Sequence, residues 1–427
     1  MTVQSRIRDL VEATPLVDTH EHLIEESHRL NWTPGDGLFP CDDWAYLFMH
    51  YLGDDLVSAG MTEEDKKRFL SSEETTETKY RLVAPWWERT KHTGYAQAVR
   101  RTLKGLYGEN DLTAESAPRI AEKYLAMVKP GFYREILKEK SNLENCHVNS
   151  LQKIFMETEQ PELLLQDIGF PALSSDLDLR RVELEYGKSA NELDGWLAII
   201  DEIFEKHGKQ AVAAKNQSAY SRRLNYADVP KETAAPLFKK LASGKALDLN
   251  ERKDLQDYLF HYCVRKATEY RLPVKLHTGY YAGNYGMPLE RISQNASDLC
   301  EVIQSNPDTK FVLMHIGWPY QDEYIALAKR FPNVSIDLCW AWIINPAASV
   351  RFVKEFLMAA PANKLFPFGG DYITVETVYG HSQIARQGMA QALSELIAEG
   401  WIQEEEAPEL IERLFRGNAH ELYGKRD

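Results

Sequence analysis

The hydrophobic pattern is most regular in the second half of the chain, where short apolar runs alternate with longer amphipathic stretches. The apolar runs have the length of buried strands and lie at 210–215, 273–276, 311–314, 334–338 and 365–370. The stretches between them, such as 291–305 and 322–330, carry apolar residues at helical spacing. Regular alternation of strands and helices predicts a parallel α/β fold.

The first half of the chain shows fewer apolar runs and more helical periodicity. The elements expected there are a helix at 3–13, strands beginning at Leu16, at 150–157 and at 162–168, and helices at 114–127, 132–140 and 191–207. Pro15 ends the first helix, because proline lacks the backbone N–H that a helix needs. The long region 28–149 is therefore expected to be helical and to separate the first two strands.

Residues that bind metals stand at the ends of several expected strands. His20 and His22 are two positions apart, so on a strand both imidazoles point to the same face. Four further polar residues end or follow apolar runs in the same way: Lys215, His277, His315 and Asp371. A lone His-x-His is a weak motif that a histidine-rich surface strand can also show. The repetition at other strand ends favours a metal site, since zinc takes neutral imidazole nitrogens.

These residues, in this order, resemble the amidohydrolase superfamily. The matching stretches are Ala213-Ala214-Lys215-Asn216-Gln217-Ser218-Ala219-Tyr220, Leu276-His277-Thr278-Gly279-Tyr280, Met314-His315-Ile316-Gly317-Trp318-Pro319 and Gly370-Asp371-Tyr372 with Glu376-Thr377. Within the superfamily the chain is most similar to the amidohydrolase-related branch, which includes nodulin-like and FluG-like domains, and more distantly to uronate isomerases. The resemblance covers the first strand and the region from about 208 onwards, and it is poor between 27 and 190.

The resemblance implies a (β/α)8 TIM-like barrel with a helical insertion after strand 1. The barrel would comprise residues 1–27 and 150–427, and the insertion residues 28–149. Active sites of such barrels lie at the C-terminal ends of the strands, so an insertion after strand 1 is a candidate lid. Uronate isomerases carry a helical insertion at the same place.

The resemblance also implies roles for the residues at the strand ends. The implied metal ligands are His20, His22, His277, Asp371 and, as a bridging carbamate, Lys215. We favour an unmodified Lys215 that contacts substrate, with the carbamate as the alternative. Asp371 would move the catalytic proton, and His315 would polarise the substrate or ligate a second ion. The expected cofactor is one divalent ion, with two as the alternative; zinc is the first choice and Mn, Fe or Co are alternatives.

The implied reaction is hydrolysis of an amide, lactone or related bond in a small, carboxylated substrate by metal-activated water. The alternative is a uronate-isomerase-like isomerase, or a decarboxylase or hydratase, that uses the same metal site. A barrel that retains only a binding or scaffold role is disfavoured, because all expected ligands are present. The fold alone does not separate hydrolysis from isomerisation.

The candidate substrate contacts are Lys215, Tyr220, Arg222, Arg223, Arg89, Tyr280, Trp318, Trp340 and Glu376. Guanidinium groups match carboxylates, which makes the arginines candidates for binding an acid. The family tends to show Ala-Tyr-Arg, whereas this chain has Ala219-Tyr220-Ser221-Arg222-Arg223. Which of the two arginines, if either, faces the pocket is therefore open.

Arg89 belongs to an aromatic and basic stretch, 85–95, inside the expected insertion. Trp86 and Trp87 beside Arg89 would suit one wall of a pocket for an anionic or carbohydrate-like ligand. The alternative, which we favour, is a helix that packs its tryptophans on the barrel, because buried aromatic residues usually belong to a core.

Composition and charge restrict partners and compartment. The formal net charge of −14 argues against binding nucleic acid or an anionic membrane surface. The five cysteines are scattered without a C-x-x-C motif, which favours a reducing cytoplasm. No N-terminal signal segment and no apolar run of about 18 residues is visible, so no membrane span is expected. A homo-oligomer is the common expectation for such an enzyme.

Overall fold

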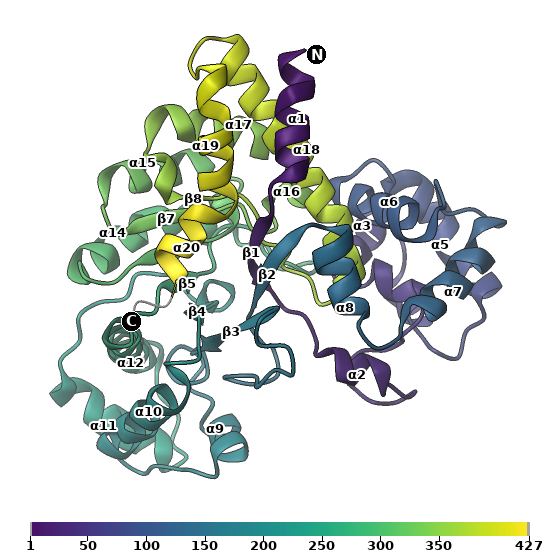
Figure 1. Ribbon diagram of the computed structural model, residues 1–427. Coiled ribbons are helices and arrows are strands. Elements are labelled where there is room, and N and C mark those ends of the chain that lie inside the picture. Colours follow the sequence, from purple (N-terminus) through teal and green to yellow (C-terminus); the bar gives the residue numbers. More distant parts are fainter. Residues whose placement is uncertain (1, 425–427) are drawn as a thin grey trace.

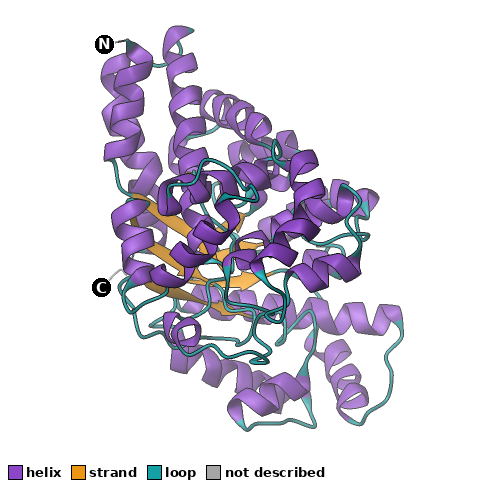
Figure 2. Cartoon of the chain, turned by 90° about the vertical axis from the view of Figure 1, so that its right-hand side faces the viewer, coloured by secondary structure: helices purple, strands orange, loops and turns teal. Residues whose placement is uncertain are grey.

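The computed structural model describes residues 2–424 and contains a (β/α)8 TIM-like barrel. Eight parallel strands pair in chain order. Their bounds are β1 Leu16–Glu21, β2 Leu143–Val148, β3 Leu164–Gly169, β4 Ala213–Asn216, β5 Val274–Leu276, β6 Phe311–Leu313, β7 Val334–Asp337 and β8 Leu365–Phe366. Backbone hydrogen bonds from Thr19 N to Phe368 O (3.0 Å) and from Asp371 N to His20 O (2.9 Å) join β1 to the segment after β8. The predicted barrel is confirmed, and the strands lie at the centre of the molecule (Figure 2).

Helices pack around the strands on the outside of the barrel (Figure 1). Those outside the insertion are α1 Val3–Ala13, α9 Leu179–Tyr186, α10 Leu193–His207, α11 Lys231–Ala242, α12 Leu249–Glu269, α13 Leu289–Ser293, α14 Asn295–Ser305, α15 Gln321–Arg330, α16 Ala341–Ile344, α17 Pro346–Ala359, α18 Val375–Ala398, α19 Ala407–Glu412 and α20 Asn418–Tyr423. The helices expected at 3–13, 191–207 and 322–330 are present within one or two residues. The helix expected at 291–305 is divided into α13 and α14 at Gln294.

The region between β1 and β2 is helical, as its periodicity predicts, and most of it stands to one side of the barrel (Figure 1). Its elements are α2 Glu26–Leu30, a 3-10 helix Trp44–Phe48, α3 Tyr51–Ser58, α4 Glu63–Phe69, α5 Thr76–Thr90, α6 Gly94–Tyr107, α7 Ser116–Met127, α8 Phe132–Arg134 and a π-helix Glu135–Lys140. Its own aromatic core includes Trp44, Phe48, Phe69 and Trp87, with ring centroids 5.4–5.8 Å apart. Trp87 is therefore a core residue, packed within the insertion.

The expectation for strand 2 was wrong. Residues 150–157 are irregular, and β2 lies earlier, at Leu143–Val148, inside the range assigned to the insertion. β2 contains polar residues, which a periodicity argument does not assign to a buried strand. His147, for example, is buried, and there its Nδ1 lies 3.4 Å from Lys275 Nζ while its ring packs edge-on against Tyr423. Contacts with residues so distant in the chain leave no local signal.

A buried ion-pair network joins the insertion to the barrel. Arg29 of α2 is fully buried, and its Nη2 lies 2.8 Å from both Asp42 Oδ1 and Glu376 Oε1. Tyr124 of α7 accepts a further hydrogen bond from Arg29 at 2.7 Å. Glu376 lies in the first turn of α18, directly after β8, so this network fixes the insertion against the C-terminal end of the barrel.

In the described part of the chain, no helix combines the length and hydropathy needed to cross a membrane.

Acid is expected to destabilise the protein partly through His381. Its ring is buried in α18 between Phe368 and Tyr372. Burial lowers the pKa of His381 from 6.5 to about 3. A depressed pKa means that the folded state binds fewer protons than the unfolded state between these values. The contribution of His381 to stability is therefore complete above pH 6.5 and falls by about 1.4 kcal/mol per pH unit below it, until the folded pKa is reached.

We predict that His381→Gln flattens the decline of unfolding free energy between pH 7 and pH 4. Urea denaturation at several pH values measures this slope. His92→Gln, at an exposed position of the insertion, is the matched control and should keep the wild-type slope. An unchanged slope in His381→Gln would contradict the prediction.

Candidate metal centre

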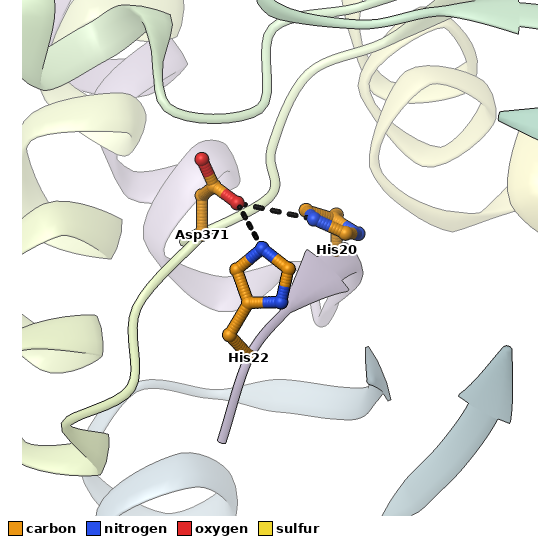
Figure 3. Close-up of side chains that lie close together, drawn as sticks. All are labelled: His20, His22 and Asp371. Atoms are coloured by element: carbon orange, nitrogen blue, oxygen red, sulfur yellow. Dashed lines mark ion pairs between the residues drawn. The ribbon is translucent and has the colours of Figure 1, made fainter. Parts of the chain in front are cut away.

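Side chains from several strands converge at the C-terminal end of the barrel. His20 lies in β1, His22 directly follows it, and Asp371 follows β8 (Figure 3). Asp371 Oδ1 lies 3.0 Å from His20 Nε2 and 3.2 Å from His22 Nε2. The predicted convergence of these three residues is thus present in the structure.

The hydrogen bonds of His22 imply that a cation belongs between its ring and Asp371. His22 Nδ1 lies 2.6 Å from the carbonyl oxygen of Asn149, which can only accept, so Nδ1 carries the proton. In the neutral ring Nε2 then presents a lone pair to the carboxylate oxygen of Asp371. Neither ring nitrogen of the buried His20 makes a hydrogen bond within the described residues, and its Nε2 faces the same Asp371 oxygen. A bound metal ion satisfies these acceptors together.

His277 and His315 show the same arrangement. His277 Nε2 donates to Tyr280 O at 2.9 Å, and His315 Nδ1 donates to Cys339 O at 3.0 Å. The remaining nitrogens, His277 Nδ1 and His315 Nε2, face each other at 3.0 Å. Two lone pairs at this distance repel unless a proton or a metal ion lies beside both.

The distances between these atoms fit metal ligation. Two ligands about 2.1 Å from one ion, at angles of 90–110°, are roughly 3.0–3.4 Å apart. Two groups have ligand atoms within 4.8 Å of one another: His20 with His22 and Asp371, and His315 with Cys339 and Asp371. His277 belongs to neither group, but its Nδ1 lies 3.0 Å from Nε2 of His315, which belongs to the second group. The donor set suits a divalent ion and leaves its identity open between zinc and the other expected metals.

Burial keeps His20, His277 and His315 neutral and therefore able to ligate. It lowers the pKa of His20 and His277 well below the usual range and that of His315 to about 4. The charge of Lys215 lowers the pKa of all three further. Burial by itself would raise the pKa of Asp371, but the neighbouring imidazoles of His20 and His22, whose Nε2 atoms lie 3.0 and 3.2 Å from its Oδ1, hold that pKa well below its usual value. The carboxylate is thus ionised, as a metal ligand must be.

Lys215 lies in β4 and is buried at the centre of the barrel. Its Nζ is 3.0 Å from Met314 Sδ, and no carboxylate of the described residues lies within ion-pair distance. Burial lowers the pKa of Lys215, although the nearby charge of Asp371 opposes this effect. An amine of lowered pKa is available in its neutral form for a substrate or for carbamate formation.

Tyr51, which the sequence analysis missed, contacts the centre from the insertion. Its hydroxyl lies 2.6 Å from Asp371 Oδ2 and 2.5 Å from the backbone oxygen of Asp371. Burial and the charge of Asp371 raise the pKa of Tyr51 well above 10, so the phenol keeps its proton. The preceding residue, His50, has φ 68°. Such backbone strain in a non-glycine residue often marks a functional site, but it is visible only in the structure.

Several of the predicted substrate contacts surround the metal ligands. The Tyr220 ring lies 4.5 Å from that of His277. Trp340 stacks on Tyr51 at 4.6 Å and lies 5.7 Å from Tyr280, which contacts Trp318 at 4.9 Å. The roles of these aromatic residues remain predictions, and their positions are compatible with them.

The other predicted contacts have different partners in the structure. Arg222 pairs with Asp257, Arg223 pairs with Asp298, and Glu376 pairs with Arg29. Arg89 is exposed on α5, where it stacks on Trp86 and donates to Ala59 O at 3.0 Å. The geometry therefore brings none of these four side chains to the metal ligands, because each is held by an acid, an arginine or a backbone carbonyl elsewhere.

The loop after β5 closes against the insertion beside the centre. Gly283 N donates to Asp54 Oδ2 at 2.8 Å, and Asn284 Nδ2 donates to Asp54 O at 3.0 Å. Tyr220 accepts from Ala282 N of the same loop at 3.1 Å. Asp54 lies in α3 with Tyr51, so one helix carries both a contact to Asp371 and the contact to this loop.

Comparison with known proteins identifies the class of enzyme. A model of the amidohydrolase family, Amidohydro_2, matches residues 210–425, about half of the chain. The protein therefore belongs to the amidohydrolase family, whose superfamily consists of metal-dependent enzymes on TIM-like barrels.

Individual relatives extend the match over the insertion. A uronate isomerase of Rhizobium meliloti is 22% identical over 461 aligned residues, which cover 97% of this chain and 94% of the isomerase. The FluG protein of Emericella nidulans is 25% identical over 179 residues, and this match spans 40% of the chain and only 20% of FluG. The solved structure of a uronate isomerase from Thermotoga maritima has a TM-score of 0.77 at 17% identity, covering 99% of this chain and 97% of its own. At that identity the structural likeness describes the fold alone.

Proposed function

We propose that the protein is a metal-dependent isomerase that interconverts the aldose and ketose forms of a uronate-like sugar acid. The observation that carries this proposal is the contact between Tyr51 and Asp371 beside the metal ligands. Isomerisation moves one proton between two carbons and another between two oxygens, which suits two separate groups, whereas in hydrolysis a single carboxylate can take the proton of activated water and pass it to the leaving group. The match of the whole chain, insertion included, to a uronate isomerase supports the same choice.

The two groups suit the two proton transfers that isomerisation requires. One proton must leave the carbon that carries the hydroxyl and arrive at the neighbouring carbonyl carbon, and one must pass between the two oxygens. Asp371 is ionised and takes the carbon-bound proton and returns it. Tyr51 is protonated, donates to the substrate oxygen that gains a proton, and recovers one from the oxygen that loses it. A bound divalent ion supplies Lewis-acid polarisation of the substrate oxygens.

Lys215 is the basic side chain best placed for the substrate's carboxylate or hydroxyl groups, since it has no ion-pair partner in the described structure. The aromatic rings of Tyr280 and Trp340 provide a surface against which a sugar ring packs. The loop after β5 and the insertion exclude bulk water once the substrate is bound, which favours proton transfer without hydrolysis.

The direct test is incubation of the metal-loaded protein with D-glucuronate and D-galacturonate in D2O, followed by NMR. We expect a ketose product and, where the abstracted proton exchanges with solvent, deuterium on the carbon next to the carbonyl. A panel of amides and lactones of sugar acids is assayed in parallel. Hydrolysis of that panel without isomerisation of any uronate would overturn the proposal.

Tyr51→Phe is expected to lower kcat by about 10²–10³-fold while leaving the metal content unchanged, because it removes one proton donor and no metal ligand. Steady-state kinetics and metal analysis of the same preparation measure both quantities. Tyr46→Phe is the matched control, because the buried Tyr46 hydroxyl has no hydrogen-bond partner among the described residues. Equal activity of the two variants would exclude Tyr51 from the chemistry.

Hydrolysis is the second candidate, and the state of Lys215 favours it. A buried amine with a lowered pKa is suited to carbamate formation and hence to a bridged pair of ions. Metal analysis of wild type and Lys215→Ala distinguishes the two functions. Two ions that fall to one or none in the variant favour hydrolysis, and one ion in both proteins favours isomerisation with Lys215 as a substrate contact.

A further inference from the structure

An aspartate lies one turn after Tyr51 on α3. Asp55 is four residues further along the helix, so the two side chains share a face and their Cβ atoms are about 5–6 Å apart. Asp55 is half-buried, and its Oδ2 is buried without a hydrogen-bond partner among the described residues. A buried carboxylate oxygen without a donor is costly, and a ligand that brings a donor removes this cost.

The rings around Asp55 place its carboxylate beside the aromatic wall of the metal centre. Burial raises the pKa of Tyr95, Tyr280 and Tyr372, and the charge of Asp55 raises each of them further, so all three lie near the carboxylate. The ring centroids of Tyr95 and Tyr372 are 5.3 and 5.2 Å from that of Tyr51. Asp55 therefore lies at the same cavity as the proposed proton donor, on the side of the insertion.

The neighbouring acid of α3, Asp54, is already occupied. It pairs with Lys66 at 3.2 Å and accepts from Gly283 N at 2.8 Å. Asp55 has only the hydroxyl of Thr93 beside it: burial raises the pKa of Asp55, and this hydroxyl opposes the effect. A hydroxyl donated by a substrate would act in the same direction as Thr93, because it stabilises the ionised carboxylate.

We propose that Asp55 is a specificity-determining residue that accepts a hydrogen bond from a hydroxyl group of the sugar acid and so directs the substrate's carboxylate away from the insertion. This inference rests on the proposed function and adds an orientation and a preference to it. Lys215, on the side of the barrel, offers a donor for the carboxylate. Asp55 attracts hydroxyl groups and repels a second carboxylate. The site should therefore take sugar acids with one carboxylate and discriminate against diacids.

The test compares the binding of two sugar acids that have no carbonyl group to isomerise: D-gluconate, with one carboxylate, and D-glucarate, with two. Isothermal titration calorimetry of the metal-loaded protein gives both dissociation constants. We expect wild type to bind D-gluconate at least about tenfold more tightly than D-glucarate. Asp55→Asn should weaken the binding of D-gluconate by about tenfold and abolish the preference, because it removes a charge-assisted hydrogen bond and the repelling charge.

Asp36→Asn, at an exposed position of the insertion, is the matched control and should keep the wild-type preference. If Asp55→Asn does not fold, Asp55→Ala takes its place, and the same loss of preference is expected. Equal binding of the two acids by wild type overturns the inference, as does an Asp55 variant that keeps the wild-type preference. Wild type that binds neither acid refutes the proposed function itself, whereas unchanged selectivity in the variant refutes the inference alone.

Discussion

Asp371→Asn is expected to cause the largest loss of activity of any single substitution in this chain. Asp371 is a ligand common to both candidate metal groups and the partner of the Tyr51 hydroxyl. The amide can neither take a proton nor supply the negative charge that a dication requires. Loss of general base catalysis alone lowers kcat by about 10²–10⁴-fold, and loss of metal adds to this. We therefore expect activity near the detection limit and less than one ion per chain.

The experiment combines metal analysis with kinetics at saturating added metal. If added metal restores occupancy, the remaining loss of kcat reports the proton-transfer role by itself. Asp322→Asn, at an exposed position in the first turn of α15, is the matched control and should change neither quantity. An Asp371→Asn variant with wild-type metal content and kcat would contradict the assignment of the centre.

Arg29→Met is expected to cause the largest loss of stability. The substitution leaves the carboxylates of Asp42 and Glu376 buried without their cation, and the Arg29 side chain itself is fully buried. Removal of one partner from a buried ion pair typically costs about 3–5 kcal/mol, a large part of the roughly 5–15 kcal/mol that stabilises a folded domain. The free energy of unfolding in urea measures the loss.

Two variants show whether the loss comes from the buried charges. Arg119→Met breaks a surface pair with Glu109 and should leave the free energy of unfolding nearly unchanged, because solvent screens this exposed pair. Neutralisation of both carboxylates in the Arg29→Met background, with Asp42→Asn and Glu376→Gln, should recover part of the stability. If Arg29→Met and Arg119→Met were equally stable, the network would not be what holds the insertion to the barrel.

For Glu376 the sequence predicted the location of the side chain but not its contact. Its position shortly after Asp371 predicts proximity to the site, and Glu376 does lie at that end of the barrel in α18. Its contact, however, is with Arg29, which lies far away in the chain. Arg222 and Arg223 are similar cases, because Asp257 and Asp298 neutralise the guanidinium groups that the sequence leaves apparently free.

Local pattern was sufficient for the parallel α/β class and for the candidate metal ligands, and the family resemblance added the barrel. Apolar runs have the length of strands, and polar residues at their ends must lie at one edge when the strands are parallel. His20, His22 and Asp371 could therefore be named without a structure. β2 could not be located, since its polar residues are satisfied inside the barrel by partners such as Lys275.

The sequence by itself thus determined the parallel α/β class, a helical insertion and a candidate metal centre at the strand ends, because each depends on periodicity or on the position of a residue relative to its own strand. Only the tertiary structure decided that Tyr51 contacts Asp371, that Cys339 faces the same centre, and which charged groups are already paired. The physical reason is that these contacts join segments far apart in the chain. Their geometry is set by how the insertion and the strand ends pack, and local sequence does not encode that packing.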